Sequence, residues 1–257
     1  MSVIGWLKLS ETKSIKDLDD VAVTRLHSGI ISRKGFLKKI YLDSYEEFKK
    51  IQNNSGNGFL VELGSGGGLI KQVIPTAITS DVVKVDNIDL CFSAESLPFQ
   101  DNTVDGFFML NVLHHIKKPE HFLRELSRCL KADGKILIIE PANTLWSRFI
   151  YQRFHHEDFD PEAGWGLDKQ GRLSAANDAL GWIIFVRDKE IFENEFPGLR
   201  IKKIKLHTPL RYLISGGLSL RQLLPSWAYQ PVKGLEYILS PLNRYIGMFM
   251  SVELDKV

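Results

Sequence analysis

The sequence has very little cysteine, almost no net charge and no long uninterrupted run of apolar residues. Its two cysteines, Cys91 and Cys129, lie in apolar contexts without a partner at metal-ligand spacing, so we expect reduced core thiols and no disulfide framework. No window approaches the roughly 18 consecutive apolar residues that a membrane-spanning helix needs. The apolar stretch near the N-terminus is too short for a signal peptide, and these absences predict a cytoplasmic protein.

The charge balance excludes one large class of partner. The chain carries 33 basic and 31 acidic residues, a formal net charge of +2, so it lacks the electrostatic footprint of nonspecific nucleic-acid binding. A hydrophobic content of 44% and a charged content of 25% are typical of a globular protein with a substantial core. For 257 residues we expect one elaborated α/β domain and no nucleic-acid partner.

Short apolar segments alternate with segments that have helical or loop character. The segment 119–130 is a predicted helix, because Phe122, Leu123, Leu126 and Leu130 lie three or four positions apart. The alternation predicts a Rossmann-like fold, a mostly parallel twisted sheet with helices on both faces. The predicted strands lie near residues 59–63, 77–80, 88–92, 106–110, 135–139, 200–206 and 245–254.

The segments around this core have their own composition. Residues 147–179 are rich in aromatics, His, Asp and Gly, which is typical of an irregular active-site cover. A helix is expected over 188–196, where Pro197 and Gly198 end it. The single domain then divides into a helical N-terminal cap (1–57), a cofactor-binding core (58–142), and a substrate cover with C-terminal strands (143–257) that includes a helical insertion at about 208–244.

A glycine-rich turn follows the first predicted strand. In Val61-Glu62-Leu63-Gly64-Ser65-Gly66-Gly67-Gly68, glycines after a strand permit a tight turn and let a ligand approach the backbone, which indicates a nucleotide-like ligand. The dinucleotide fingerprint requires a third glycine where this chain has Leu69 or, in the other register, Lys71. Glu62 would repel a pyrophosphate and suits a cation, so the sequence disfavours NAD.

An acid at the end of the second predicted strand is placed to bind a ribose. Asp81 ends the apolar run after the turn, where a carboxylate accepts hydrogen bonds from both ribose hydroxyls, and Asp86 is the competing candidate. Only six residues separate Asp81 from Ile88, whereas a parallel crossover usually needs about a dozen or more. Either the third strand is vestigial or the ribose acid is not Asp81.

Three motifs together resemble one enzyme family. VELGSGGG (61–68), AESLPFQDNTVDGFFMLNVLHHI (94–116) and PEHFLRELSRCLKADGKILIIEP (119–141) are similar in order and spacing to class I S-adenosylmethionine-dependent methyltransferases, in the small-molecule group that includes the ubiquinone-type enzymes. The resemblance covers about a third of the chain. It implies S-adenosylmethionine as cofactor and S-adenosylhomocysteine as product.

The resemblance also implies roles for individual residues. Glu62 and the Asn111 backbone carbonyl would face the methionine ammonium, and Ala94 would donate its backbone N–H to the adenine. Ser93 stands where the family commonly has an aspartate for the adenine amino group, and Glu95 is the possible substitute. The expected cofactor-binding residues are Glu62, Gly64, Ser65, Gly66, Gly67, Asp81, Ser93, Ala94, Glu95 and Asn111.

Two histidines follow the fourth predicted strand at the ligand-binding edge. His114 or His115 could serve as a general base, a step needed only when the acceptor atom is protonated. The alternative is that the pair packs and hydrogen-bonds the turn.

Four further residues are candidates for contact with the acceptor. His155 and His156 lie in the irregular cover segment, and Tyr41 and Tyr45 lie in the N-terminal helical region, where core packing is the alternative. Adjacent histidines project in different directions on most backbones, so we expect no metal unless ligands come from elsewhere.

The segment 210–244 combines apolar residues, Trp and Tyr with scattered basic residues. This composition fits an interfacial helix on anionic lipid, and the alternatives are packing on the sheet or a contact between two copies of the chain. We therefore expect an S-adenosylmethionine-dependent methyltransferase with a small-molecule or lipid-like acceptor, in the cytoplasm or peripheral at the inner membrane face. A non-catalytic adenosyl-binding module is the alternative function.

Overall fold

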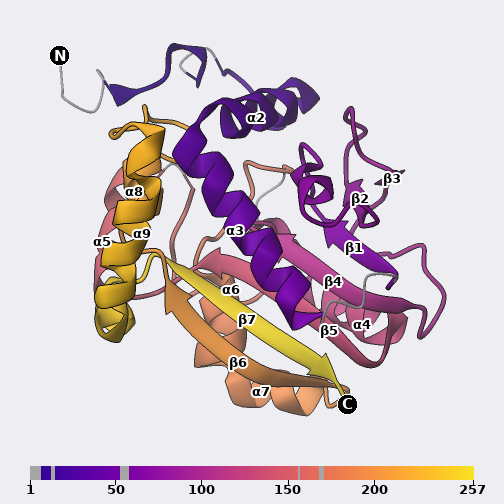
Figure 1. Ribbon diagram of the computed structural model, residues 1–257. Helices are drawn as coiled ribbons and strands as arrows, with labels where there is room; N and C mark the ends of the chain where they lie inside the picture. Colours follow the sequence, from indigo (N-terminus) through magenta and orange to yellow (C-terminus); the bar gives the residue numbers. More distant parts are fainter. Residues whose placement is uncertain (1–6, 13–14, 53–57, 156, 168–170) are drawn as a thin grey trace.

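A seven-stranded sheet forms the centre of the protein, as the computed structural model shows for residues 7–12, 15–52, 58–155, 157–167 and 171–257 (Figure 1). The strand order is β3-β2-β1-β4-β5-β7-β6, and β7 alone among these strands runs opposite to the other six. This arrangement confirms the predicted mostly parallel, Rossmann-like sheet. The strands are β1 Leu60–Leu63, β2 Ile78–Asp81, β3 Leu90–Cys91, β4 Val104–Leu110, β5 Leu130–Pro141, β6 Leu199–His207 and β7 Phe249–Lys256.

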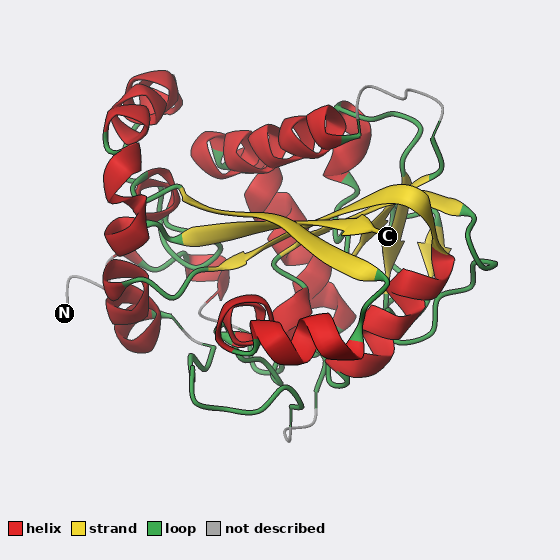
Figure 2. Ribbon diagram, turned by 90° about the horizontal axis from the view of Figure 1, so that it is seen from below, coloured by secondary structure: helices red, strands yellow, loops and turns green. Residues whose placement is uncertain are grey.

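Helices cover both faces of this sheet (Figure 2). They are α2 Val21–Arg33, α3 Gly35–Ile51, α4 Pro119–Cys129, α5 Leu145–Phe154, α6 Leu180–Trp182, α7 Lys189–Glu195, α8 Arg211–Ser215, α9 Tyr229–Ile238 and α10 Asn243–Ile246. Short turns of 3-10 or π helix are η1 Ser10–Thr12, η2 Leu69–Gln72, η3 Leu113–His115, η4 Ile183–Arg187, η5 Ser226–Ala228 and η6 Ser240–Leu242.

One face of the sheet is covered by α4, α6 and α7. Helix α4 matches its predicted range, begins with Pro119 at its first turn, and buries Phe122, Leu123 and Leu126 completely. These side chains join the buried faces of β1, β4 and β5 in one hydrophobic cluster. Helix α4 therefore fixes the position of β4, whose carboxyl end carries the site, by packing on this face of the sheet.

The other face carries the N-terminal helices α2 and α3. Asp20 caps α2 by accepting a hydrogen bond from the Ala22 N–H. From α3, Tyr45 and Phe48 pack on Phe108 of β4, with ring centroids 5.3 and 5.1 Å apart. The N-terminal helices thus belong to the core packing as well as to the rim of the site.

The connections after β1 and β2 are unusually short. Only η2 lies between β1 and β2, and the loop 82–89 between β2 and β3 contains no helix. Strand β3 has two residues, which pair in parallel with Ser80 and Asp81. Both residues of β3 are exposed at the edge of the sheet, so the prediction of a core thiol was wrong for Cys91, whereas Cys129 is buried. The third strand is therefore vestigial, and Asp81 is the last residue of β2.

The segment 147–179 differs from the prediction at its start. Residues 147–154 belong to helix α5, which begins after a reciprocal capping box between Thr144 and Ser147. The expectation of irregular structure was wrong there, because a capping signal in the sequence was missed. The described residues from 157 to 179 contain no regular helix or strand.

The C-terminal insertion is helical, as expected, and comprises α8, η5, α9, η6 and α10. Arg211 anchors it: its Nη1 lies 2.7 Å from Asp43 Oδ2 of α3, and its backbone N–H donates to Glu236 Oε1 of α9 at 2.7 Å. The Tyr229 hydroxyl donates to the same Asp43 oxygen at 2.7 Å. Among the residues that the structure describes, no helix is long and apolar enough to cross a membrane.

Candidate cofactor and acceptor site

A cavity of about 1280 Å³ opens at the carboxyl ends of β1, β2 and β4, beneath the N-terminal helices and the C-terminal insertion. Ligands in open parallel sheets bind at this edge. The expected site residues in the described chain all line it: Tyr41, Tyr45, Glu62, Gly64, Ser65, Gly66, Gly67, Asp81, Ser93, Ala94, Glu95, Asn111, His114, His115 and His155. His156 lies outside the described residues.

The glycine-rich turn has different requirements at each position. Gly64 and Gly66 both have positive φ, +68° and +56°. A Cβ at Gly64 would collide with the Val112 side chain, so packing alone requires a glycine there. A Cβ at Gly66 would meet no protein atom within 4 Å, which leaves this stretch of backbone open to a ligand in the cavity.

Asp81 is held in position at the tip of β2. Its Oδ2 accepts a hydrogen bond from the Gly66 N–H at 3.1 Å, and its Oδ1 accepts from the Val83 N–H at 3.2 Å. The competing acid, Asp86, is exposed, forms an ion pair with Arg25 at 3.4 Å, and does not line the cavity. Of the two acids, only Asp81 lines the cavity.

Two buried acceptors face the cavity without a hydrogen-bond partner among the described residues: Glu62 Oε2 and Asn111 Oδ1. Burial raises the pKa of Glu62 to about 8. Hydrogen bonds from the Ser65 and Tyr45 hydroxyls lower this pKa, and the nearby charge of Asp81 raises it, but burial has the largest effect. Asn111 has a positive φ of 57°, which Asn tolerates better than most residues. Buried acceptors without partners are costly, so this pair suits a cationic donor such as an ammonium.

The expected adenine end of the cavity has fewer polar groups to offer. The Ser93 hydroxyl accepts a hydrogen bond from the Glu95 N–H at 3.2 Å. The Glu95 carboxylate accepts from the Lys118 N–H at 3.1 Å, so it already has a partner in the protein. Val82 and Phe92 line this end as apolar walls, and sequence reasoning did not single them out.

A cluster of histidines and carboxylates forms the opposite end of the cavity. His114 Nδ1 lies 2.5 Å from Glu140 Oε2, and the other oxygen of Glu140 accepts from the Val112 and Leu113 N–H groups at 2.8 and 2.7 Å. Glu140, near the end of β5, and Asp178 were both missed by sequence reasoning. An acid near the end of a predicted strand, as at Glu62 and Asp81, was the available signal for Glu140.

The charged groups in this cluster shift the pKa values of one another. Burial lowers the pKa of His114, but Glu140, Asp178 and Glu157 outweigh it and raise the pKa to about 10. Burial raises the pKa of Glu157, whereas His155 and His114 lower the pKa of Asp178 despite its burial. At neutral pH His114 is therefore protonated in this arrangement.

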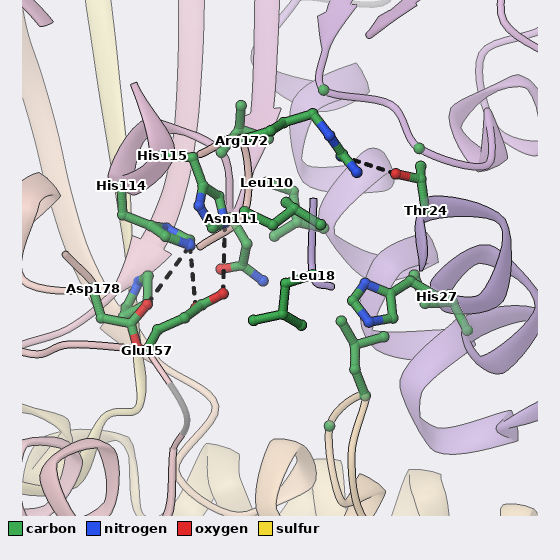
Figure 3. Close-up of a pocket in the computed structure, with 18 of the residues that line it drawn as sticks. Leu18, Thr24, His27, Leu110, Asn111, His114, His115, Glu157, Arg172 and Asp178 are labelled. Carbon is green, nitrogen blue, oxygen red and sulfur yellow. Dashed lines mark hydrogen bonds and ion pairs between the residues drawn. The ribbon is translucent and has the colours of Figure 1, made fainter. Parts of the chain in front are cut away.

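Helix α2 and the segment 171–174 face this cluster across the cavity, and Figure 3 shows Thr24, His27 and Arg172 on that side. The Asp19 carboxylate ties the two elements together, because it accepts from the Arg172 and Leu173 N–H groups at 2.6 Å each. Burial lowers the pKa of His27 to about 4, so this wall presents a neutral imidazole. The cap and the cover segment thus close one side of the cavity as a unit.

Comparisons with known proteins agree with this geometry. Residues 61–138 match a family model described as a methyltransferase domain. A demethylmenaquinone methyltransferase from Symbiobacterium thermophilum is 35% identical over 82 residues, which are 31% of this chain and 32% of that protein. The chain therefore matches about a third of the length of this curated relative.

A solved structure shares the fold over a longer stretch. The crystal structure of a SAM-dependent methyltransferase from Archaeoglobus fulgidus superposes with a TM-score of 0.54 at 14% identity, covering 84% of this chain and 94% of that one. At this identity the similarity shows a common fold.

Proposed function

Because the chain contains a class I S-adenosylmethionine-dependent methyltransferase domain, we propose that it transfers the methyl group of S-adenosylmethionine to a small-molecule acceptor with apolar character. The pair of buried acceptors without partners, Glu62 Oε2 and Asn111 Oδ1, carries this proposal. They lie in the cavity with the open backbone at Gly66, where the methionine ammonium would supply the missing donor.

The remaining residues of the cavity fit the rest of the cofactor. Asp81 would accept hydrogen bonds from the ribose hydroxyls, and Phe92, Val82 and Ala94 would enclose the adenine. The cofactor supplies a methyl group that is bonded to a sulfonium. The methyl group moves to the acceptor, and the electron pair of the broken bond stays on the sulfur. The protein's part is to align the acceptor with that methyl group and to exclude water.

A protein base is required only for an acceptor that is protonated at its reactive atom. Of the two histidines proposed for this role, His114 is engaged with Glu140 and is protonated at neutral pH, which leaves His115 as the candidate. His115 lies on the same wall of the cavity.

The size and lining of the cavity favour an acceptor with a large apolar part. Its volume of about 1280 Å³ exceeds the roughly 300–1,000 Å³ of an ordinary ligand pocket, so it has room for a cofactor and an acceptor together. Part of its lining is apolar and comes from the N-terminal region, α5 and the C-terminal insertion: Leu18, Ile31, Ile150, Leu213 and Leu218.

We extend the proposal to an acceptor that reaches the cavity from a membrane surface. Helix α5 has Leu145, Trp146 and Phe149 in solvent, and Phe154 both lines the cavity and is half exposed. Helix α5 contacts α10 of the C-terminal insertion, and the insertion exposes further large apolar side chains. The exposed apolar side chains of this surface are Leu145, Trp146, Phe149, Phe154, Trp227, Leu235, Tyr237, Ile238, Leu242 and Tyr245.

Basic residues accompany these apolar side chains. The Arg153 guanidinium lies 4.5 Å from the Phe149 ring centroid, and that of Arg244 lies 4.5 Å from the Tyr245 ring centroid. Aromatic and basic groups side by side favour the interface of an anionic membrane. On this proposal the protein is cytoplasmic and contacts the inner membrane face.

Calorimetric titration with S-adenosylmethionine, S-adenosylhomocysteine and NAD tests the cofactor part of the proposal. We expect binding of the two adenosyl compounds and none of NAD. Gly66→Val should abolish binding, because its side chain would fill the open approach at a site where it meets no protein atom. Gly164→Val, at an exposed glycine with equally free space outside the cavity, controls for the added side chain. Circular dichroism of Gly66→Val controls for the strain that a valine adds at a φ of +56°.

A folded wild-type protein that binds neither adenosyl compound would contradict the proposal. The alternative function, a non-catalytic adenosyl-binding module, predicts the same titration. It differs in a second assay, in which radiolabelled methyl groups from S-adenosylmethionine are traced into a lipid extract and a polar metabolite extract. Cofactor binding without labelled product in either extract would favour the module.

A further inference from the structure

We propose that His114, His155, Glu157 and Asp178 form a binding site for a divalent transition-metal ion at the acceptor end of the cavity. All four residues line the cavity, and they come from three separate parts of the chain: η3, the end of α5 with the residues after it, and the segment before α6. Figure 3 shows His114, Glu157 and Asp178 pointing toward one another.

The donor atoms of His155, Glu157 and Asp178 all lie within 4.8 Å of one another, and His114 lies beside them. Glu157 Oε2 lies 3.6 Å from both His114 Nε2 and His155 Nδ1, and His114 Nε2 lies 3.6 Å from Asp178 Oδ1. Metal bonds of about 2.0–2.1 Å in a tetrahedral arrangement place neighbouring ligand atoms about 3.3 Å apart. The contacts of 3.6 Å are close to this value, so His155, Glu157 and Asp178 form the centre of the proposed site and His114 supplies a further ligand.

Asp178 is the most buried carboxylate of the four residues, with a side chain that is 1% exposed. Its Oδ2 lies 2.8 Å from His155 Nδ1, and its Oδ1 lies 3.6 Å from His114 Nε2, so both oxygens face the nitrogen atoms of the proposed ligands. A buried carboxylate is costly unless a cation pairs with it, and a metal ion between these groups would be that cation.

The surroundings of His114 prepare it to bind a metal. Its Nδ1 faces Glu140, which is itself fixed by two backbone N–H groups, so Nδ1 keeps its hydrogen when a metal ion displaces the proton from Nε2. The lone pair of Nε2 is then directed toward Glu157 and Asp178. A carboxylate behind a metal-binding histidine commonly fixes the tautomer in this way.

The donor set selects the kind of ion. Two imidazole nitrogens with two carboxylates favour Zn²⁺, Fe²⁺, Co²⁺ or Mn²⁺, whereas Mg²⁺ and Ca²⁺ prefer sites made only of oxygen. From the sequence, no metal is expected unless ligands come from elsewhere in the chain, because adjacent histidines project in different directions on most backbones. The missing ligands come instead from His114 and Asp178, which are distant in the sequence. An ion here would meet an oxygen atom of the acceptor.

Titration of the tag-free, chelator-treated full chain with Co²⁺ tests the proposal, because coordinated Co²⁺ absorbs visible light in a way that depends on its ligands. We expect one Co²⁺ per chain, displaced by Zn²⁺ and not by Mg²⁺. Asp178→Asn and Glu157→Gln should each weaken Co²⁺ binding by about tenfold or more. His121→Gln, at an exposed histidine of α4, is the matched control and should leave Co²⁺ binding unchanged.

S-adenosylhomocysteine binding in the same samples separates loss of a ligand from loss of the fold, since Glu62 and Asp81 lie outside the cluster. A variant that binds S-adenosylhomocysteine normally and has lost Co²⁺ supports the site. If Asp178→Asn does not fold, Glu157→Gln, in the irregular segment, decides the question. A folded wild-type chain that binds no Co²⁺, or folded variants that bind it as tightly as wild type, would overturn the proposal.

Discussion

Single side chains at the strand ends carry the chemistry proposed for this protein, and Glu62 is the clearest case. It is 3% exposed at the end of β1, and the cost of burying its charge raises its pKa to about 8. A bound ammonium would repay that cost by stabilising the ionised carboxylate. Cofactor binding and Glu62 ionisation should therefore be coupled.

This coupling predicts the pH dependence of cofactor binding. Below pH 8 Glu62 is protonated in the free protein, so the bound cation must displace a proton, and affinity for S-adenosylhomocysteine should fall as the pH is lowered from 9 to 6. Calorimetry in buffers of different ionisation enthalpy would count the released proton. In Glu62→Gln this proton release should disappear, and its persistence there would refute the assignment.

Asp81 gives the second prediction at the residue scale. Asp81→Ala should weaken S-adenosylmethionine binding by about 1.5–3 kcal/mol, because a charged acceptor for the ribose hydroxyls is lost. Asp86→Ala, which removes an exposed acid paired with Arg25, is the control and should bind normally. The opposite result in calorimetry, with Asp86→Ala the weaker variant, would move the ribose contact to Asp86.

At the scale of elements, short connections and added helices distinguish this chain. The loop 82–89 stands where a crossover helix is usual, so no helix from this connection covers the sheet edge at β3. Helix α5 and the C-terminal helices are additions after β5 and β6. Trp227 and Tyr237 of the C-terminal insertion are 77% and 82% exposed. Packing of the insertion on the sheet does not explain why such large apolar side chains lie in solvent.

These exposed side chains predict binding to anionic vesicles. In flotation experiments the wild-type chain should rise with vesicles containing phosphatidylglycerol and remain behind with pure phosphatidylcholine. The double variant Trp227→Glu/Ile238→Glu should lose binding, because both side chains are largely exposed and would have to enter the interface.

Ile191→Glu, at an exposed apolar residue of α7, is the matched control and should float like the wild type. A wild-type chain that fails to float, yet sediments as a dimer that the double variant abolishes, would assign the surface to contact between two copies of the chain.

At the scale of the whole molecule, the cavity exists because three remote parts of the chain meet over the sheet edge. The N-terminal helices contribute Tyr41 and His27, the strand ends contribute the cofactor residues, and the insertion contributes Leu213. Asp43 and Arg211 connect the first and last of these parts at 2.7 Å. A change in that contact would alter the cavity without touching any residue of the cofactor turn.

The sequence by itself determined the parallel sheet, the glycine-rich turn and the acids that follow β1 and β2. These features are local: apolar periodicity marks strands and helices, and Gly66 or Asp81 is recognisable from its neighbours within a few positions. The helix α4 and the helical insertion were predictable for the same reason. Helix α5 was missed although its capping signal is also local.

Only the tertiary structure decided which distant groups share the cavity. Glu140, Glu157 and Asp178 surround His114 because β5, the cover segment and η3 converge, and no spacing in the sequence encodes that meeting. Which of Asp81 and Asp86 lines the cavity likewise depended on the direction of the chain after β2. Burial and charge coupling arise from such contacts, so they appear only once the chain is folded.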